Sequence, residues 1–123
     1  MSERRAAVVA GHGAFAEGLV SAVAAVIGPA HGLMGVTNVD ATSEGILARL
    51  RDAVTASGAS VIFTDLPAGS CTMAARRLAR THPGLAVVTG ASLPVVLAFA
   101  AGTPLEAAVA SGRAALVLAE GGA

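Results

Sequence analysis

The chain has 123 residues, which is enough for one domain with a hydrophobic core, and 54% of them are hydrophobic although only 2% are aromatic. All eight basic residues are arginines, and they balance eight acidic residues to a formal net charge of zero. Without a basic stripe or an aromatic stacking surface, the composition argues against nucleic-acid binding. The single cysteine, Cys71, excludes an intrachain disulfide and suits a reducing compartment.

The two most apolar stretches do not have the pattern of a signal peptide or a membrane span. His12 and Glu17 interrupt the stretch over residues 6–27, and residues 93–101 fall well short of the ~20 residues needed to span a bilayer. We therefore expect a cytoplasmic protein.

Short β-rich runs alternate along the chain with longer runs of helical periodicity. The expected strands are 6–10, 32–36, 60–64, 85–89 and 114–119. The expected helices are 14–27, a helix from Thr42 or Ser43 to Ser57, one from Gly69-Ser70 to about Thr81, one capped by Ser92, and one from Gly102-Thr103-Pro104 to about Gly112. This alternation predicts βαβ units, a mainly parallel sheet and one α/β domain over residues 1–123.

The helical periodicity also predicts which side chains face the core. In the first helix these are Phe15, Leu19, Ala22, Val23, Val26 and Ile27, and in the second they are Ile46, Leu50, Ala53 and Val54. The arginines of the third helix, Arg76, Arg77 and Arg80, should face water.

Chemistry-bearing residues follow the predicted strands at their carboxyl ends, where open parallel sheets bind ligands. His12 follows the first strand, Asp65 the third, and Gly90-Ala91-Ser92 the fourth. If the first and third strands are neighbours, His12 and Asp65 meet in one crevice.

His12 and Asp65 are the candidate catalytic residues. Gly11 and Gly13 flank the histidine and allow other molecules to approach its ring. A carboxylate bonded to one ring nitrogen would fix the tautomer and leave the other nitrogen free as a nucleophile. The alternatives are an ordinary loop histidine and an aspartate that forms an Asx turn or a helix cap.

The segment Pro67-Ala68-Gly69-Ser70 is a candidate phosphate site. Gly69 and Ser70 begin a helix, where free backbone N–H groups, a hydroxyl and the helix dipole favour an anion. Gly13 is the third candidate phosphate-binding residue. The alternative is an ordinary serine cap.

Neither ATP nor a metal is expected to take part. The chain has no Walker-type phosphate loop. His12, His31, His82 and Cys71 are too scattered to show the spacing of metal ligands. Cys71 is interpreted as a small buried hydrophobe rather than a reactive thiol. We therefore expect no metal and no other cofactor.

Three motifs in order resemble the enzyme IIA component of the mannose family of bacterial sugar phosphotransferase systems. They are Val8-Val9-Ala10-Gly11-His12-Gly13, Phe63-Thr64-Asp65-Leu66-Pro67-Ala68-Gly69-Ser70, and Val87-Val88-Thr89-Gly90-Ala91-Ser92-Leu93-Pro94. The resemblance covers nearly the whole chain.

The resemblance implies a phosphohistidine carrier that needs no metal. His12 would accept a phosphoryl group from HPr and pass it to a IIB component, which phosphorylates a sugar during uptake through the membrane IIC and IID components. Asp65 would hold the other ring nitrogen, and Gly69 and Ser70 would form the phosphate-binding turn. Ala68 stands where the family often has glycine, and Cys71 where it often has proline.

The resemblance also implies an open sheet of four parallel strands plus one antiparallel strand, with helices on both faces. The family is typically dimeric, with this last strand exchanged between subunits, and residues 114–119 are placed to form it. The expected assembly is therefore a homodimer.

Three other functions stay open at this point. One is the phosphocarrier subunit of a dihydroxyacetone kinase, which has a similar early histidine. Another is a regulatory module whose phosphorylation state is read by a transcription activator. The third is a hydrolase built on Ser70, His12 and Asp65, which would need Ser70 within hydrogen-bond reach of the ring and lacks the Gly-x-Ser-x-Gly spacing.

Overall fold

The computed structural model describes residues 5–122, so residues 1–4 and 123 of the expected domain lie outside it. The strands are β1 (Ala7–Gly11), β2 (Leu33–Thr37), β3 (Val61–Thr64) and β4 (Ala86–Val88). The helices are α1 (Phe15–Ile27), α2 (Ser43–Ser57), α3 (Ser70–Arg80), α4 (Leu93–Ala100) and α5 (Leu105–Ala115). The first four predicted strands and all five predicted helices are confirmed, with small shifts at their ends.

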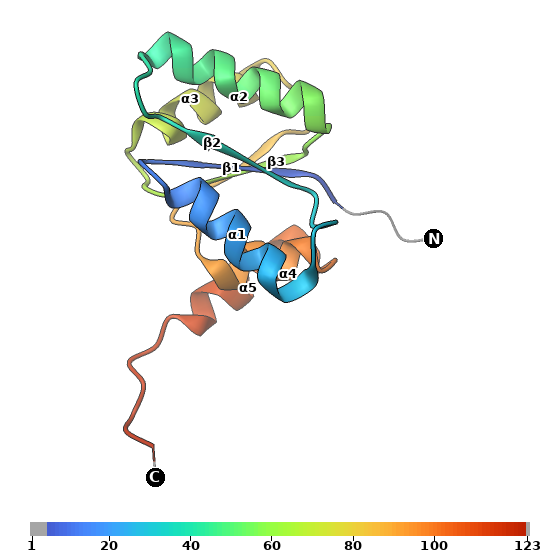
Figure 1. Ribbon diagram of the computed structural model, residues 1–123, viewed down its shortest axis with the longest axis vertical. Coiled ribbons are helices and arrows are strands. Elements are labelled where there is room, and N and C mark those ends of the chain that lie inside the picture. The colour runs from blue at the N-terminus through green and yellow to red at the C-terminus, as the bar shows by residue number, and fades with distance from the viewer. Residues whose placement is uncertain (1–4, 123) are drawn as a thin grey trace.

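The four strands form one parallel sheet in the order β2-β1-β3-β4. The chain moves outward from β1 to β2 and then crosses back over β1 to β3. Because such crossovers are right-handed, this reversal puts α1 on one face of the sheet and α2 and α3 on the other (Figure 1). The switch in strand order lies between β1 and β3, which is where sheets of this kind bind ligands.

Alternate residues of β1 belong to two different cores, because successive side chains of a strand point to opposite faces. Val8 and Ala10 pack with α2 and α3, whereas Ala7 and Val9 pack with α1, α4 and α5. All four side chains are completely buried. The predicted helices on both faces are therefore present, and they bury both faces of β1.

Local sequence signals set the ends of α2. The Thr42 hydroxyl accepts a hydrogen bond from the Gly45 backbone N–H at 3.0 Å, and Gly58 ends the helix in the left-handed conformation that favours glycine. The predicted inward residues of α2 are all buried. The three arginines of α3 are exposed, as predicted.

One predicted core residue of α1 is not in the core. Val26 is 62% exposed, whereas Val23, three residues earlier, is completely buried. Val26 lies at the edge of the apolar stripe near the end of α1. Periodicity thus located the apolar face of α1 but included Val26 and missed Ala16, which is 1% exposed.

The predicted fifth strand over residues 114–119 is wrong for the single chain. α5 continues to Ala115, and residues 116–122 form neither helix nor strand and extend away from the domain (Figure 1). Alanine is the best helix former, so Ala114 and Ala115 extend α5. The three apolar residues that follow belong to no strand and lie exposed: Leu116, Val117 and Leu118.

None of the helices in the described part of the chain has the length and apolar character needed to traverse a bilayer.

The core on the α4 side depends on two phenylalanines. Phe63 of β3 and Phe99 of α4 meet edge to face, with ring centroids 5.5 Å apart. We expect Phe99→Ala to lower the free energy of unfolding by about 3–5 kcal/mol, because it leaves a cavity against Phe63. Urea unfolding measures this, with the exposed-site change Val26→Ala as control. A loss for Phe99→Ala no larger than the control would contradict the packing described.

Candidate functional site

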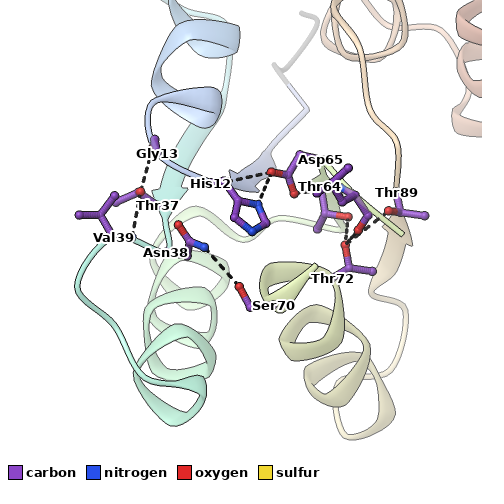
Figure 2. Close-up of polar contacts among 11 residues, drawn as sticks. His12, Gly13, Thr37, Asn38, Val39, Thr64, Asp65, Ser70, Thr72 and Thr89 are labelled. Atoms are coloured by element: carbon purple, nitrogen blue, oxygen red, sulfur yellow. Dashed lines mark hydrogen bonds and ion pairs between the residues drawn. The ribbon is translucent and has the colours of Figure 1, made fainter. Parts of the chain in front are cut away.

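The strand order brings His12 and Asp65 together. Val8 to Ala10 of β1 pair with Ile62 to Thr64 of β3, so the two strands end side by side at the same edge. His12 directly follows β1, and Asp65 directly follows β3. Their side chains point toward one another (Figure 2). The predicted meeting of these two residues in one crevice is therefore confirmed.

One carboxylate oxygen holds both the backbone and the ring of His12. Asp65 Oδ2 accepts a hydrogen bond from the His12 backbone N–H at 2.8 Å and lies 2.8 Å from His12 Nδ1. The other oxygen, Oδ1, accepts from the Leu66 backbone N–H at 2.9 Å. The aspartate side chain is 11% exposed and the histidine side chain 49%, so the ring is much more open to solvent than the carboxylate that holds it.

These contacts decide the charge of Asp65 and the tautomer of the neutral His12 ring. Burial acts to raise the pKa of Asp65, but the hydrogen bonds from the His12 backbone, the His12 ring and the Leu66 backbone outweigh it and hold the pKa below its ordinary value. Asp65 is therefore a carboxylate, which can only accept. Nδ1 must carry the proton in their contact, so the neutral ring has an unprotonated Nε2 that faces away from Asp65.

Two glycines make this close approach possible. A Cβ at Gly11 would lie 2.6 Å from Phe15 Cδ2 and 2.8 Å from Asp65 Oδ2. A Cβ at Gly69 would lie 3.2 Å from His12 Cε1. Side chains at these positions would displace the carboxylate or the ring. Gly13 differs, because a Cβ there would have no neighbour within 4 Å. Its φ of +54° lies in the left-handed region, so glycine suits this position for its backbone conformation and not for lack of space.

The start of α3 faces the same crevice. Gly69 precedes the helix and provides no side-chain cap, so the N–H groups of the first turn are free for another acceptor. His12, Ser70 and the turn over residues 66–69 line an open hollow of about 540 Å³. An anion in this hollow would meet helix N–H groups and a hydroxyl beside the histidine ring.

A buried hydroxyl holds the turn before α3. Thr72, which is 1% exposed, donates from its hydroxyl to the Leu66 carbonyl and lies 2.6 Å from the Thr64 hydroxyl. The Gly69 N–H donates to the same carbonyl at 3.1 Å. Thr72 therefore links β3 to the turn that carries Asp65 toward Ser70. No pattern in the sequence had pointed to it.

A second residue that the sequence pattern did not indicate is Asn38, which directly follows β2. Its Nδ2 donates to Ser70 Oγ at 3.3 Å, and it lies on the side of His12 opposite the Thr72 network (Figure 2). The rule that ligands bind at the carboxyl ends of parallel strands could have pointed to Asn38 as it did to Asp65.

Other candidates lie elsewhere. Gly90 and Ser92 line a different hollow, between β4 and α5. Cys71 is completely buried, as predicted; burial and the charge of Asp65 raise the pKa of its thiol to about 11, so it is not a nucleophile. Within residues 5–122, no hydrogen bond joins Ser70 to the His12 ring, so the arrangement does not support a hydrolase. Nor does this range contain three or more His, Cys, Asp or Glu side chains grouped to hold a metal.

Comparison with known proteins extends this description. The profile of the family described as "PTS system fructose IIA component" matches residues 6–116. No curated protein sequence matches the chain.

Several solved structures share the fold. The mannose/sorbose specific IIA subunit of the phosphotransferase system from Enterococcus faecalis is 19% identical, with a TM-score of 0.84 and 98% of each chain covered. The PTS IIA protein associated with the fucose utilization operon from Streptococcus pneumoniae is 20% identical, with a TM-score of 0.82, over 95% of this chain and 94% of that one. A sigma-54 interaction domain protein from Enterococcus faecalis is 18% identical, with a TM-score of 0.69, over 93% and 91%.

The close contacts of Gly11 generate a test of the site's geometry. We expect Gly11→Ala to push Asp65 away from His12, because the new methyl group would overlap Oδ2. Nitrogen-15 NMR of the His12 ring should then show a mixture of tautomers in place of protonated Nδ1. The control is Gly18→Ala on α1, where nothing lies within 4 Å of the added methyl group and the ring signals should not change. Unchanged ring signals in Gly11→Ala would contradict the geometry.

Proposed function

Because the chain belongs to the PTS system fructose IIA component family, we propose that it is a phosphohistidine carrier in sugar uptake. His12 accepts a phosphoryl group from HPr and passes it to a IIB component. The observation that carries this proposal is the 2.8 Å contact between Asp65 Oδ2 and His12 Nδ1, which leaves Nε2 as the free nucleophile. The sugar-specific IIC and IID components are indirect partners in the membrane.

The transfer step follows from the tautomer. The Nε2 lone pair of His12 attacks the phosphorus of phospho-HPr as the bond from phosphorus to the donor histidine breaks, and that histidine keeps the bonding electron pair. The His12 ring keeps its Nδ1 proton and becomes positively charged. Asp65 stabilises this charge. In a second displacement a histidine of IIB attacks the phosphorus, the bond to Nε2 breaks, and Nε2 of His12 keeps the bonding electron pair.

The start of α3 supports the same chemistry. Transfer of a phosphoryl group depends mainly on positioning and on stabilising its equatorial oxygens. The first-turn N–H groups of α3, with Gly69, Ser70 and the exposed Gly13 around His12, supply neutral donors for these oxygens. Neutral donors hold the group without a metal, so we propose that the carrier works without one.

We further propose a homodimer in which the segment after α5 pairs with β4 of a second copy. β4 is at the end of the strand order, and a groove of about 470 Å³ runs between it and α5. Leu116, Val117 and Leu118 are 90%, 70% and 101% exposed, respectively. Pairing of this segment with β4 as an antiparallel strand would bury these side chains and cover the exposed sheet edge.

The same phosphorylated histidine could serve a different acceptor. A dihydroxyacetone kinase subunit or a transcription activator would use identical chemistry at His12. The fold shared with a sigma-54 interaction domain protein bears on the second of these. Presenting the labelled protein to each purified acceptor separates them, and we expect transfer to IIB.

The central test is phosphorylation by enzyme I, HPr and phosphoenolpyruvate. We expect an acid-labile mass increase on the wild type, none on His12→Ala, and an unchanged increase on His82→Ala, which alters an exposed histidine elsewhere. Asp65→Asn should slow labelling by about 10²-fold or more, because the amide can donate to Nδ1 and so favour the tautomer with a protonated Nε2. Label on His12→Ala would overturn the proposal.

The dimer has its own test. We expect the double change Val117→Asp and Leu118→Asp to convert the dimer to monomers, because it would place two carboxylates in the apolar contact. Sedimentation measures the mass, and Val26→Asp, at an exposed valine of α1, is the control. A wild type that sediments as a monomer would contradict this part of the proposal.

A further inference from the structure

Asn38 is a polar side chain beside His12 that has no role in the phosphoryl transfer proposed for this site. Its Nδ2 carries two protons, and the contact with Ser70 Oγ at 3.3 Å uses one of them. The side chain is half-buried and lies beside the His12 ring, with its amide directed toward Ser70 at the start of α3 (Figure 2). The second proton is therefore available to a group held between His12 and Ser70.

The backbone on both sides of Asn38 is tightly fixed. Arg49 of α2 donates from Nη1 to the Thr37 carbonyl at 2.7 Å and to the Val39 carbonyl at 2.9 Å. The Asn38 N–H donates to the Gly11 carbonyl at 3.2 Å, which ties it to the residue before His12. The Thr37 hydroxyl donates to the Gly13 carbonyl at 2.8 Å, on the other side of His12.

This anchoring decides between two interpretations of Asn38. If Asn38 only capped its own loop, its segment would not need hydrogen bonds to Gly11 and Gly13 on both sides of the histidine, nor the contacts that Arg49 makes with Thr37 and Val39. A donor that must meet a small group at His12 does need them, because a donor is effective only when it is held at the position where charge develops.

We propose that Asn38 binds an oxygen of the phosphoryl group on His12 through its free Nδ2 proton, and that Arg49 is the residue that positions it. This inference rests on the proposed function. Asn38 and Ser70 then approach the phosphoryl group together, from β2 and α3, while Asp65 holds the ring from β3. Nε2 lies between these groups.

Asn38→Asp is the discriminating variant. Ser70 can donate to the new carboxylate, so the link between the two residues is kept. The N–H donor is lost, and a negative charge meets the phosphoryl oxygens. We expect labelling by phospho-HPr to slow by at least about tenfold, because repulsion between the carboxylate and the phosphoryl oxygens adds to the loss of the hydrogen bond. Asn38→Ala, which removes the donor without adding charge, should slow it by about threefold to tenfold.

Ser43→Asp is the matched control, because it adds the same charge at the exposed first residue of α2 without contacting Ser70. Its labelling rate should equal that of the wild type. Nitrogen-15 signals of the His12 ring, recorded before phosphorylation, should be unchanged in both Asn38 variants, which separates contact with the phosphoryl group from displacement of the ring.

Three results would overturn the inference alone: a wild-type rate in Asn38→Asp, a wild-type rate in Asn38→Ala, or slow labelling accompanied by altered His12 ring signals. A wild-type protein that takes up no label would instead overturn the proposed function, and this inference with it.

Discussion

A single oxygen atom, Asp65 Oδ2, organises this end of the molecule. It accepts the backbone N–H of His12 and faces Nδ1 of the same residue, each at 2.8 Å. The backbone contact fixes where the histidine leaves β1, and the ring contact fixes its tautomer and orientation. A carboxylate in this position would be unstable without such donors, since burial opposes its charge. The aspartate and the histidine backbone therefore stabilise each other, and as a consequence Nε2 is the ring nitrogen left free of Asp65.

This contact depends on the sheet. β1 and β3 are neighbours only because the chain reverses direction after β2, and the reversal also places α2 and α3 on one face and α1 on the other. The small residues then determine how close the parts come. Gly11 leaves room for Phe15 and the Asp65 carboxylate, and Gly69 leaves room for the His12 ring. The core and the site thus use the same strand: β1 is buried on both faces, and its end carries the histidine.

Sequence alone predicts the parts of this structure that depend on local pattern. Alternating helix and strand periods located β1 to β4, and the inward face of α2 followed from its spacing. Other features depend on neighbours that a pattern does not contain. Residues 114–119 fit a strand by composition, but in one chain Ala114 and Ala115 extend α5, and the residues that follow pair with no strand. Arg49, which donates to carbonyls on both sides of Asn38, comes near His12 only because β2 lies beside β1. Thr72 becomes a site residue only through hydrogen bonds to residues of β3 and the turn.

The character of the donors fits a carrier rather than an enzyme that keeps its phosphate. A group that must be received and then given away should be bound no more tightly before transfer than during it, because tight ground-state binding would slow its release. The hollow beside His12 is lined by Ser70 and the turn over residues 66–69, so it offers backbone N–H groups and a hydroxyl. Arg49, the cation anchored nearby, donates to the carbonyls of Thr37 and Val39 instead. In the proposed relay the charge of Arg49 does not contact the phosphoryl group. Arg49 holds Asn38 in place, and the neutral amide of Asn38 binds the phosphoryl oxygen. A guanidinium directed at the phosphoryl group would bind it through bidentate, charge-assisted hydrogen bonds. Such binding would favour retention of the phosphoryl group on His12 over its transfer to the next histidine.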